Sequence, residues 1–299
     1  MGPASRDEAV SELKELGLSV SRACKLTGTT RSSYYYKSRK DDSGLIAALQ
    51  QLASAYPSYG FRKCYGMLRR QGRPDNRKRV YRVYRLLKLN LRRRRKGKRR
   101  LPDRIKHPLE QQPEVNQVWA MDFMSDSLVC GSRVRTLNLI DEGSREGLAI
   151  EAASSIGSRR VIRVLERVIE ARGARPKAIR SDNGPEFTSV AFTEWCKEQG
   201  ITQVFIQKGK PMQNGYMERF NGSFRKEVLD MYLFTERWQV QVLADKWLRH
   251  YNHERPHEGL NNQTPAEWAQ TNAQLKGGGT PTLELETQNQ VTTSTLHLP

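Results

Sequence analysis

The chain has 299 residues, of which 37% are hydrophobic and 28% are charged, and its formal net charge is +19. This length accommodates one sizeable core with smaller modules, and the lack of an apolar run of about 18 residues or of an apolar leader argues against a membrane or exported protein. No C-x-x-C pair is present, which argues against a disulfide framework or a zinc finger and predicts free buried thiols at Cys24, Cys64, Cys130 and Cys196.

The positive charge is concentrated at one end of the chain. Residues 1–106 contain 29 Lys or Arg against 8 Asp or Glu, a net charge of +21, whereas the remainder contains 22 basic and 24 acidic residues. A basic arm beside a nearly neutral domain favours nucleic acid as the partner.

Residues 1–40 are predicted to form a helix-turn-helix-like unit, because apolar residues recur at helical spacing before a turn. Its apolar stripe consists of Val20, Ala23 and Leu26. Gly28 then makes the turn, Thr30 caps the following helix, and Arg31 is left exposed as a candidate DNA contact. The alternative is a helical hairpin that only packs on its neighbours, and the basic setting favours DNA binding.

Residues 41–91 are predicted to form a second helical DNA-binding unit, which ends in a helix from Arg77 to Leu89 capped by Asn76. The apolar face of this helix consists of Tyr81, Tyr84 and Leu87. Arg77 and Lys78 lie on other faces and are candidate phosphate contacts. The alternative is a charge-rich helix that is only a solvated surface.

Residues 92–113 are predicted to be a basic linker, because their Arg-rich and Lys-rich beginning has too little apolar content to fold by itself. We expect this linker to become ordered on DNA by contacting phosphates. The candidate contacts are Arg92, Arg93, Arg94 and Arg95.

Strands and helices alternate in the segment that follows, which predicts an α/β fold with a mixed sheet flanked by helices. The expected strands lie near residues 117–124, 133–140, 147–153, 177–181 and 202–206. The expected helices lie near residues 158–172 and 188–199.

Three acidic residues can form one metal site in this segment. Asp122 lies in an apolar run that is typical of a buried strand, Asp182 ends a second such run just before a turn, and Glu218 lies on a stretch compatible with a helix. Carboxylates from separate elements suit two Mg²⁺ ions that together assist phosphoryl transfer. A lone Asp at a strand end is usually a cap or a surface charge, but the three together favour a nuclease or a strand-transfer enzyme.

The segment from about Val115 to Trp268 resembles the catalytic core of insertion-sequence transposases of the OrfB type, relatives of the retroviral integrases. Residues 183–217 place 35 residues between Asp182 and Glu218, as in that family's Asp, Asp, 35, Glu pattern. A basic residue, Arg225, follows at the family's position. The Tyr251–His257 run followed by Thr264–Pro265 resembles the family's C-terminal signature, and the basic helical unit at residues 41–91 resembles its helix-turn-helix.

This resemblance implies a ribonuclease-H-like core at residues 114–270, with C-terminal helices. The remaining residues 271–299 lack clear periodicity, which predicts a weakly ordered tail. The resemblance also implies that Asp122 bridges two Mg²⁺ ions, for which Mn²⁺ can substitute, while Asp182 and Glu218 each complete one site. The expected activity is cleavage of double-stranded DNA at element ends and transfer of the 3′-hydroxyl strands into target DNA.

Further DNA contacts are expected beside the acidic residues, in part from a turn-rich loop that we expect to be mobile without DNA. They are Arg225, Lys226, Lys208, Lys210 and Gln213. Joining two ends calls for a homo-oligomer, at least a dimer. The resemblance also allows an upstream end-recognition protein or fusion, and it implies a protein of the bacterial cytoplasm, associated with the nucleoid.

Other readings of the same residues point to different chemistry. A tyrosine recombinase would use a Tyr nucleophile, but Tyr34–Tyr36 lack the accompanying Arg and His constellation. A DNA-binding regulator without catalysis would not require the three acidic residues, and a free-standing ribonuclease H would not require the basic arm. The acidic residues Asp126, Asp141 and Glu186 are expected to be surface or turn residues.

Three histidines, at positions 250, 253 and 257, resemble a series of metal ligands, but a proline inside the run interrupts any helix that would align them. The resemblance implies instead that the residues around them form a structural brace behind the active site. The expected brace consists of Tyr251, Asn252, Arg255 and Pro256.

Overall fold

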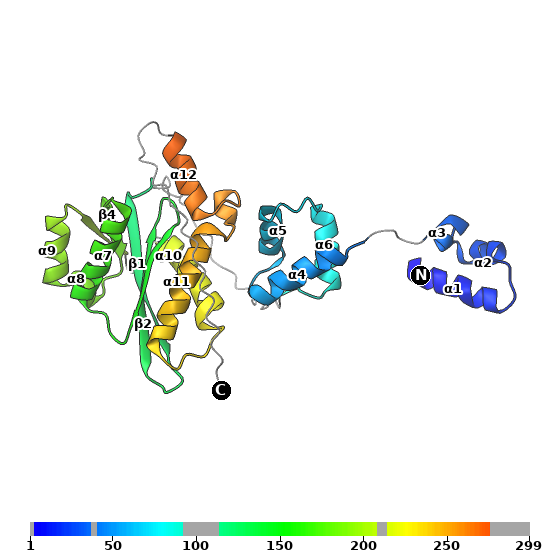
Figure 1. Ribbon diagram of the computed structural model, residues 1–299, viewed down its shortest axis with the longest axis horizontal. Helices are drawn as coiled ribbons and strands as arrows, with labels where there is room; N and C mark the ends of the chain where they lie inside the picture. The colour runs from blue at the N-terminus through cyan, green and yellow to red at the C-terminus, as the bar shows by residue number, and fades with distance from the viewer. Residues whose placement is uncertain (1–2, 37–40, 92–113, 208–213, 276–299) are drawn as a thin grey trace, which may run out of the picture.

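A computed structural model of the chain describes residues 3–36, 41–91, 114–207 and 214–275 (Figure 1). Several of the expected contacts lie outside the described residues, together with the basic linker and the end of the chain. They are Arg92, Arg93, Arg94, Arg95, Lys208, Lys210 and Gln213.

The core is built on a five-stranded mixed sheet, as the alternating pattern predicts, and the structure gives its strand order as β3-β2-β1-β4-β5. β1 pairs antiparallel with β2 and parallel with β4, β3 is antiparallel to β2, and β5 is parallel to β4. The strands are β1 (Val118–Ser127), β2 (Arg133–Asp141), β3 (Gly147–Ala153), β4 (Ala178–Ser181) and β5 (Thr202–Phe205).

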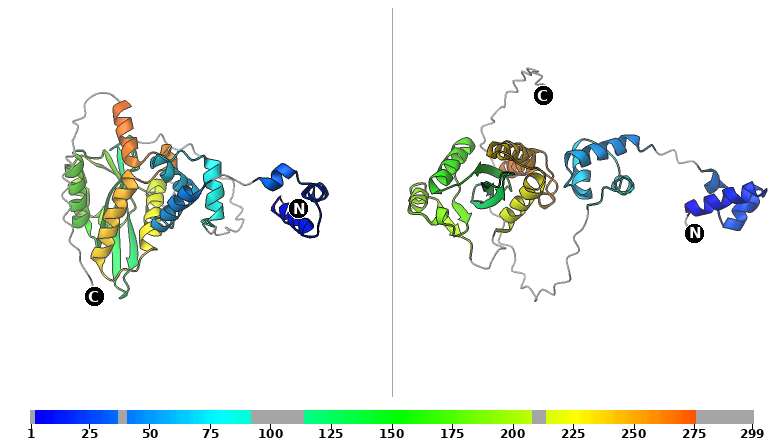
Figure 2. Two further views of the ribbon diagram at one scale, coloured as in Figure 1. Left: turned by 45° about the vertical axis from the view of Figure 1, so that its right-hand side comes forward. Right: turned by 90° about the horizontal axis from the view of Figure 1, so that it is seen from below.

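Helices cover both faces of this sheet, so its central strands are buried on two sides (Figures 1 and 2). One apolar cluster joins the sheet to α7 and α9, and a second joins the opposite face to α10, the π-helical turn η2 and α11. The flanking elements are α7 (Ser158–Arg172), α8 (Pro185–Thr188), α9 (Val190–Glu198), α10 (Gly215–Phe224), η2 (Arg225–Leu229), α11 (Arg237–His253), the 3-10 turn η3 (Glu258–Leu260) and α12 (Pro265–Leu275).

Local sequence explains where these elements end. α7 has an apolar stripe that includes Val161 and Leu165, and it stops at Gly173, whose φ of 62° is a left-handed conformation that glycine adopts without strain. The short helix α8 was not predicted, because four residues beginning with Pro185 carry no periodic signal. α12 runs to Leu275, beyond the expected end of the core at residue 270.

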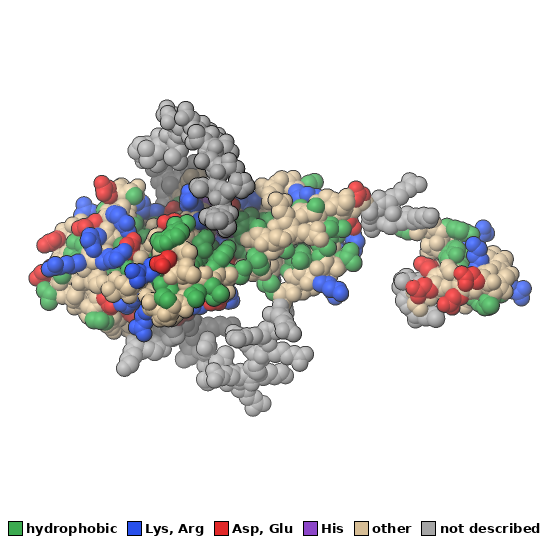
Figure 3. Space-filling view, turned by 60° about the horizontal axis from the view of Figure 1, so that its bottom comes forward, with side chains coloured by type: hydrophobic (Ala, Val, Ile, Leu, Met, Phe, Trp, Pro, Cys, Tyr) green, Lys and Arg blue, Asp and Glu red, His purple; other side chains and the backbone are tan. Residues whose placement is uncertain are grey.

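The first helices form a small unit of their own, with α1 (Pro3–Glu15), α2 (Val20–Thr27) and α3 (Arg31–Tyr35). Gly28 ends α2 in a left-handed conformation and the Thr30 side chain accepts a hydrogen bond from Ser33, as expected. The expected apolar stripe was wrong in one position: Leu26 is 66% exposed, and Cys24 is buried beside Ala23 in its place. Acidic side chains gather on one side of this unit (Figure 3).

The second helical unit has its own apolar core and consists of α4 (Ser43–Ala55), α5 (Phe61–Arg70) and α6 (Arg77–Leu86). Asn76 caps α6 by accepting from the backbone of Lys78, as predicted. The predicted apolar face needs correction, because Tyr81 is 45% exposed and the buried residues are Val80, Val83 and Tyr84.

The unit α4–α6 contacts the C-terminal helices of the core. The Tyr59 hydroxyl lies 2.8 Å from His250 Nε2, and a Cβ added at Gly66 would meet the Pro256 ring at 3.0 Å, so the two surfaces touch closely. Three ion pairs cross the same junction, namely Arg62–Glu258, Lys63–Glu227 and Arg70–Glu267.

Two further predictions about single residues were wrong. Asp141 is fully buried rather than on the surface, because its carboxylate accepts hydrogen bonds from the backbones of Asn116 and Gly143 and from the side chain of Ser144. All four cysteines are free, but Cys130, near the tip of the β1–β2 hairpin, is exposed. Among the described residues, no helix combines the length and apolar character needed to cross a membrane.

Candidate active site

Asp122 lies on β1, and Asp182 directly follows the parallel neighbouring strand β4. Val118 pairs with Ala178 and Ala120 with Arg180, so continuing this register places Asp182 beside Asp122. Neighbouring strands are roughly 4.8 Å apart and residues in register point to the same face. The strand pairing therefore directs both carboxylates to one side of the sheet.

Glu218 is presented to this side by α10. Met217 and Phe220 anchor that helix in the apolar cluster against the sheet, while Glu218 between them stays exposed in the first turn. The helix packs on β1 and β2, which include the strand of Asp122. Separate elements thus bring the three predicted acidic residues to one face.

The electrostatics of Asp122 show that the three carboxylates interact. Burial raises the pKa of Asp122 to about 6, and the negative charges of Asp182 and Glu218 add to the increase. Hydrogen bonds from the backbone of Phe123 at 2.8 Å and from Asn221 at 2.9 Å act in the opposite direction. Asp122 is therefore a desolvated carboxylate facing two like charges, which a cation would stabilise.

A chain of two amides orients the Asp122 carboxylate. Asn221 Nδ2 donates to Asp122 Oδ2, and Asn138 Nδ2 donates in turn to Asn221 Oδ1 at 2.7 Å. Asn138 is fully buried and lies directly opposite Asp122 in the β1–β2 pairing. This relay holds the Asp122 carboxylate from the neighbouring strand β2 and from α10.

Sequence reasoning did not assign Asn221 or Asn138 a role. Asn221 lies one helical turn after Glu218, so the helical spacing alone would have placed it on a nearby face. Asn138 is the only amide in an otherwise apolar stretch of β2, but its register opposite Asp122 follows only from the hairpin geometry.

The turn after β4 holds Asp182 in place. Its Oδ1 accepts a hydrogen bond from the backbone of Gly184 at 3.0 Å, and the side chain remains exposed. Beside it, Glu186 forms an ion pair with Arg135, and the Arg135 guanidinium stacks on the ring of Phe123 at 3.6 Å. Glu186 is thus a structural partner rather than a free surface acid.

Arg225 does not continue α10 but opens the π-helical turn η2. Its guanidinium donates to the backbone carbonyl of Ser125 at 2.9 Å and lies 3.4 Å from Asp126, so in this structure it is anchored to the end of β1. By contrast, Lys226 is exposed, and no ion pair involves it within the described part of the chain.

The candidate DNA contacts in the helical units lie on the surface. Arg31, Arg77 and Lys78 are all exposed. Two neighbouring arginines of α6 are not free, because Arg79 and Arg82 both pair with Asp42.

The residues around the histidine run contact the core, as the expected brace requires. Asn252 bonds both the N–H and the carbonyl of Gly147, at 2.9 and 2.8 Å, and the buried Arg255 bonds Ser223 on α10. His257 contacts the carbonyl of Tyr251, and burial lowers the pKa of His257 to about 3. These contacts hold α10 and the edge of the sheet together behind Glu218.

The donor set of the three carboxylates fits a hard divalent cation. No group of three or more Cys, His, Asp or Glu among the described residues is close enough to form a ready-made metal cage. Oxygen-only donors are the ligands that Mg²⁺ and Mn²⁺ prefer, whereas zinc sites usually include imidazole or thiolate.

A mixed sheet of this strand order, with helices on both faces, defines a ribonuclease-H-like protein of the integrase class, as the sequence predicts. Residues 112–211 and 199–265 match integrase core domain families, and residues 40–97 match an HTH-like domain family.

The curated relatives identify the family. The chain is 39% identical over 258 residues to the insertion element IS407 uncharacterized 31.7 kDa protein of Burkholderia multivorans, covering 86% of this chain and 92% of that protein. It is 36% identical to the insertion element IS476 uncharacterized 39.2 kDa protein of Xanthomonas euvesicatoria, over 90% of this chain and 78% of that protein. The chain belongs to the insertion-sequence transposases of the OrfB type.

More distant similarities extend to a named transposase and to a viral enzyme. Transposase InsD for insertion element IS2A/D/F/H/I/K of Escherichia coli is 24% identical over 78% of this chain and 80% of its own length. A solved structure of the HTLV-2 integrase catalytic core domain in complex with magnesium is 21% identical, with a TM-score of 0.43, and covers 53% of this chain and 99% of that chain.

Proposed function

We propose that this protein is a DNA transposase that cleaves the ends of its insertion element and transfers the freed 3′-hydroxyl strands into target DNA. The observation that carries the proposal is the convergence of three carboxylates: Asp122 and Asp182 continue one strand register, and the charges of Asp182 and Glu218 both raise the pKa of Asp122. Membership of the transposase family supports the same activity.

In this proposal Asp122, Asp182 and Glu218 would hold two Mg²⁺ ions. When bound, these ions supply the Lewis acidity that activates a water or a DNA 3′-hydroxyl and stabilises charge on the leaving oxygen. Asn221 keeps the Asp122 carboxylate in its orientation, and Asn138 holds Asn221. Exposed cations of α10 and the helical units then position the DNA backbone by binding its phosphates.

Joining two element ends to one target calls for at least two protomers on DNA. An upstream end-recognition protein, separate or fused, would add sequence specificity to the backbone contacts of this chain. Because its substrate is bacterial DNA, we propose that the protein works in the cytoplasm at the nucleoid.

Strand transfer by the purified chain tests the proposal. Labelled DNA ends flanking its gene are incubated with target DNA in Mg²⁺, using wild type, Glu218→Gln and Glu194→Gln, an exposed acid on α9 at the other face of the sheet. We expect joined products with wild type and Glu194→Gln, and a loss of at least about 1,000-fold with Glu218→Gln. Equal activity of Glu218→Gln and wild type would contradict the proposed site.

A further inference from the structure

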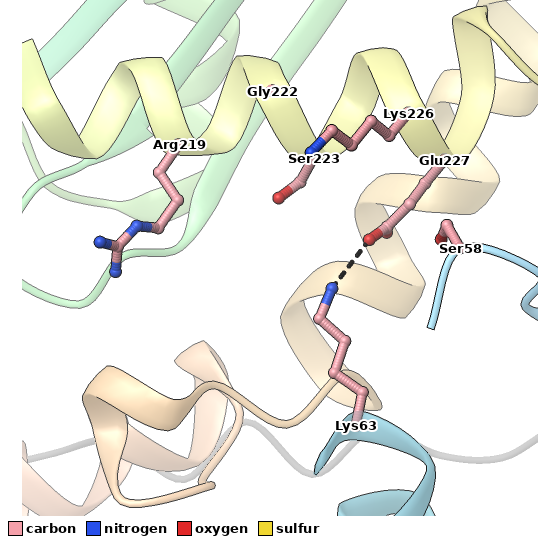
Figure 4. A pocket seen from close by; sticks show the side chains of 7 residues that line it. All are labelled: Ser58, Lys63, Arg219, Gly222, Ser223, Lys226 and Glu227. Carbon is pink, nitrogen blue, oxygen red and sulfur yellow. Dashed lines mark hydrogen bonds and ion pairs between the residues drawn. The ribbon is translucent and has the colours of Figure 1, made fainter. Parts of the chain in front are cut away.

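A pocket of about 290 Å³ lies between the helical unit α4–α6 and the helix that carries Glu218 (Figure 4). We call it the junction pocket. Its lining residues are Ser58, Lys63, Arg219, Gly222, Ser223, Lys226 and Glu227. Ser58 and Lys63 come from the helical unit and the others come from α10 and η2, so both parts of the protein build it.

The junction pocket carries an excess of positive charge. Its single carboxylate, Glu227, is already matched, because it accepts from Lys63 at 3.1 Å and from the buried Arg255 at 3.0 Å. Arg219 and Lys226 are both exposed, and neither is paired with a carboxylate within the described ranges. Two unmatched cations beside two hydroxyls form a site for an anion with several acceptor oxygens.

The surroundings of Lys63 also favour a bound anion. Burial lowers the pKa of Lys63, and the positive charges of Arg255 and Lys226 add to the decrease while Glu227 opposes it. An ammonium group that is desolvated and close to like charges gains stability when an anion enters.

The helix geometry relates this pocket to the acidic residues. Arg219, Gly222 and Lys226 share one face of α10 and η2, which adjoins the position of Glu218. Lys226 follows Glu218 by eight residues, about 12 Å along a helix. The pocket therefore lies near enough to Glu218 for one bound DNA strand to reach both.

We propose that the junction pocket binds one backbone phosphate of the element-end DNA, close to the phosphate attacked beside Glu218. This inference rests on the proposed transposase function. A phosphate held by Lys63 from one side and by Lys226 from the other would also join the helical unit α4–α6 to the core when DNA is bound.

Methylphosphonate substitutions, each of which removes the charge of one backbone phosphate, test the proposal. Methylphosphonates are placed one at a time along the element-end duplex, and the affinity of the full chain is measured by fluorescence anisotropy without divalent metal. We expect one methylphosphonate near the joined end to weaken wild-type binding about tenfold. Lys226→Gln binds unmodified DNA about tenfold more weakly, and the same methylphosphonate then has no further effect.

Lys197→Gln is the matched control, since Lys197 is an exposed lysine on α9 at the opposite face of the sheet. It should keep the wild-type response, and thermal unfolding verifies that each variant is folded. The proposal is overturned if every methylphosphonate penalty persists undiminished in both Lys226→Gln and Arg219→Gln. Strand transfer by wild type, measured in parallel, separates the two proposals. If wild type joins DNA but Lys226→Gln keeps the full methylphosphonate penalty, only the pocket proposal is refuted. If Lys226→Gln abolishes the penalty but wild type joins no DNA, only the transposase proposal is refuted.

Discussion

At the scale of single residues, the candidate site depends on side chains that hold Asp122 in position. Asn221 bonds its carboxylate, and Asn138 bonds Asn221 from a fully buried place on β2. Residues that orient a metal ligand typically change affinity or activity 10-fold to 100-fold when removed. If the proposed function holds, the two asparagines are positioning residues for the reaction.

Replacing Asn221 by Ala should lower strand transfer about 10-fold to 100-fold, because Asp122 loses a donor and the buried amide of Asn138 loses its acceptor. More Mg²⁺ or Mn²⁺ should be needed for half-maximal rate, while DNA affinity without metal stays unchanged. Metal titrations of the transfer rate measure this. Asn272→Ala on α12 is the control, since Asn272 donates to the carbonyl of Trp268 in its own helix. An unaltered metal requirement in Asn221→Ala would show that the relay has no such role.

At the scale of elements, close packing fixes α10 against the sheet. A Cβ added at Gly147, the first residue of β3, would lie 2.4 Å from Leu248 and 2.6 Å from the Phe220 ring. Phe220 follows Glu218 by two residues on α10, so any displacement at this contact is transmitted to the site. Asn252 leaves little room for adjustment, because it bonds both backbone groups of Gly147.

Gly147→Ala should therefore lower the free energy of unfolding by about 1–3 kcal/mol, the usual cost of overpacking. It should also reduce strand transfer at temperatures where the protein remains folded. Chemical denaturation and the transfer assay measure the two effects. Gly259→Ala serves as the comparison, because a Cβ there meets nothing within 4 Å. Equal stability of the two variants would argue against this tight contact.

Regular periodicity predicted most elements of the core, because strands and helices with strong apolar patterns need no tertiary information. The helix at residues 158–172 and the strand at residues 147–153 are confirmed at both ends. The predictions of burial and exposure were wrong at residues whose surroundings are set by tertiary contacts. Asp141 is buried because distant groups satisfy it, and Tyr81 is exposed because α4 and α5 pack on the other face of α6. The spacing of Asp122, Asp182 and Glu218 identified the candidate site, but the amide relay requires the strand register.

At the scale of the whole molecule, the helical unit and the core meet through charged and aromatic contacts around the C-terminal brace. His257 directly follows the residues of this brace and packs edge-on against Tyr251. Burial, aided by the charge of Arg255, lowers the pKa of His257 from 6.5 to about 3. The folded protein thus keeps this imidazole neutral in a range where the unfolded chain protonates it.

The stability of the molecule should consequently fall as the pH decreases from 6.5 toward 3. Above pH 6.5 His257 is neutral in both states and contributes no pH dependence. Near pH 5 the unfolded state binds the extra proton, which costs the folded state about 1–2 kcal/mol. Denaturation at a series of pH values should show a shallower decline between pH 6.5 and 5 for His257→Gln than for wild type. Parallel curves would contradict the lowered pKa.

We propose above that Asp122, Asp182 and Glu218 form one site for two divalent ions. The most direct test of this proposal is the stoichiometry of Mn²⁺ binding, measured by electron paramagnetic resonance on the full chain with element-end DNA. We predict two ions per protomer for wild type and for Glu194→Gln, and the loss of both for Asp122→Asn. If Asp122→Asn still binds two Mn²⁺ ions per protomer, the three carboxylates do not form this site.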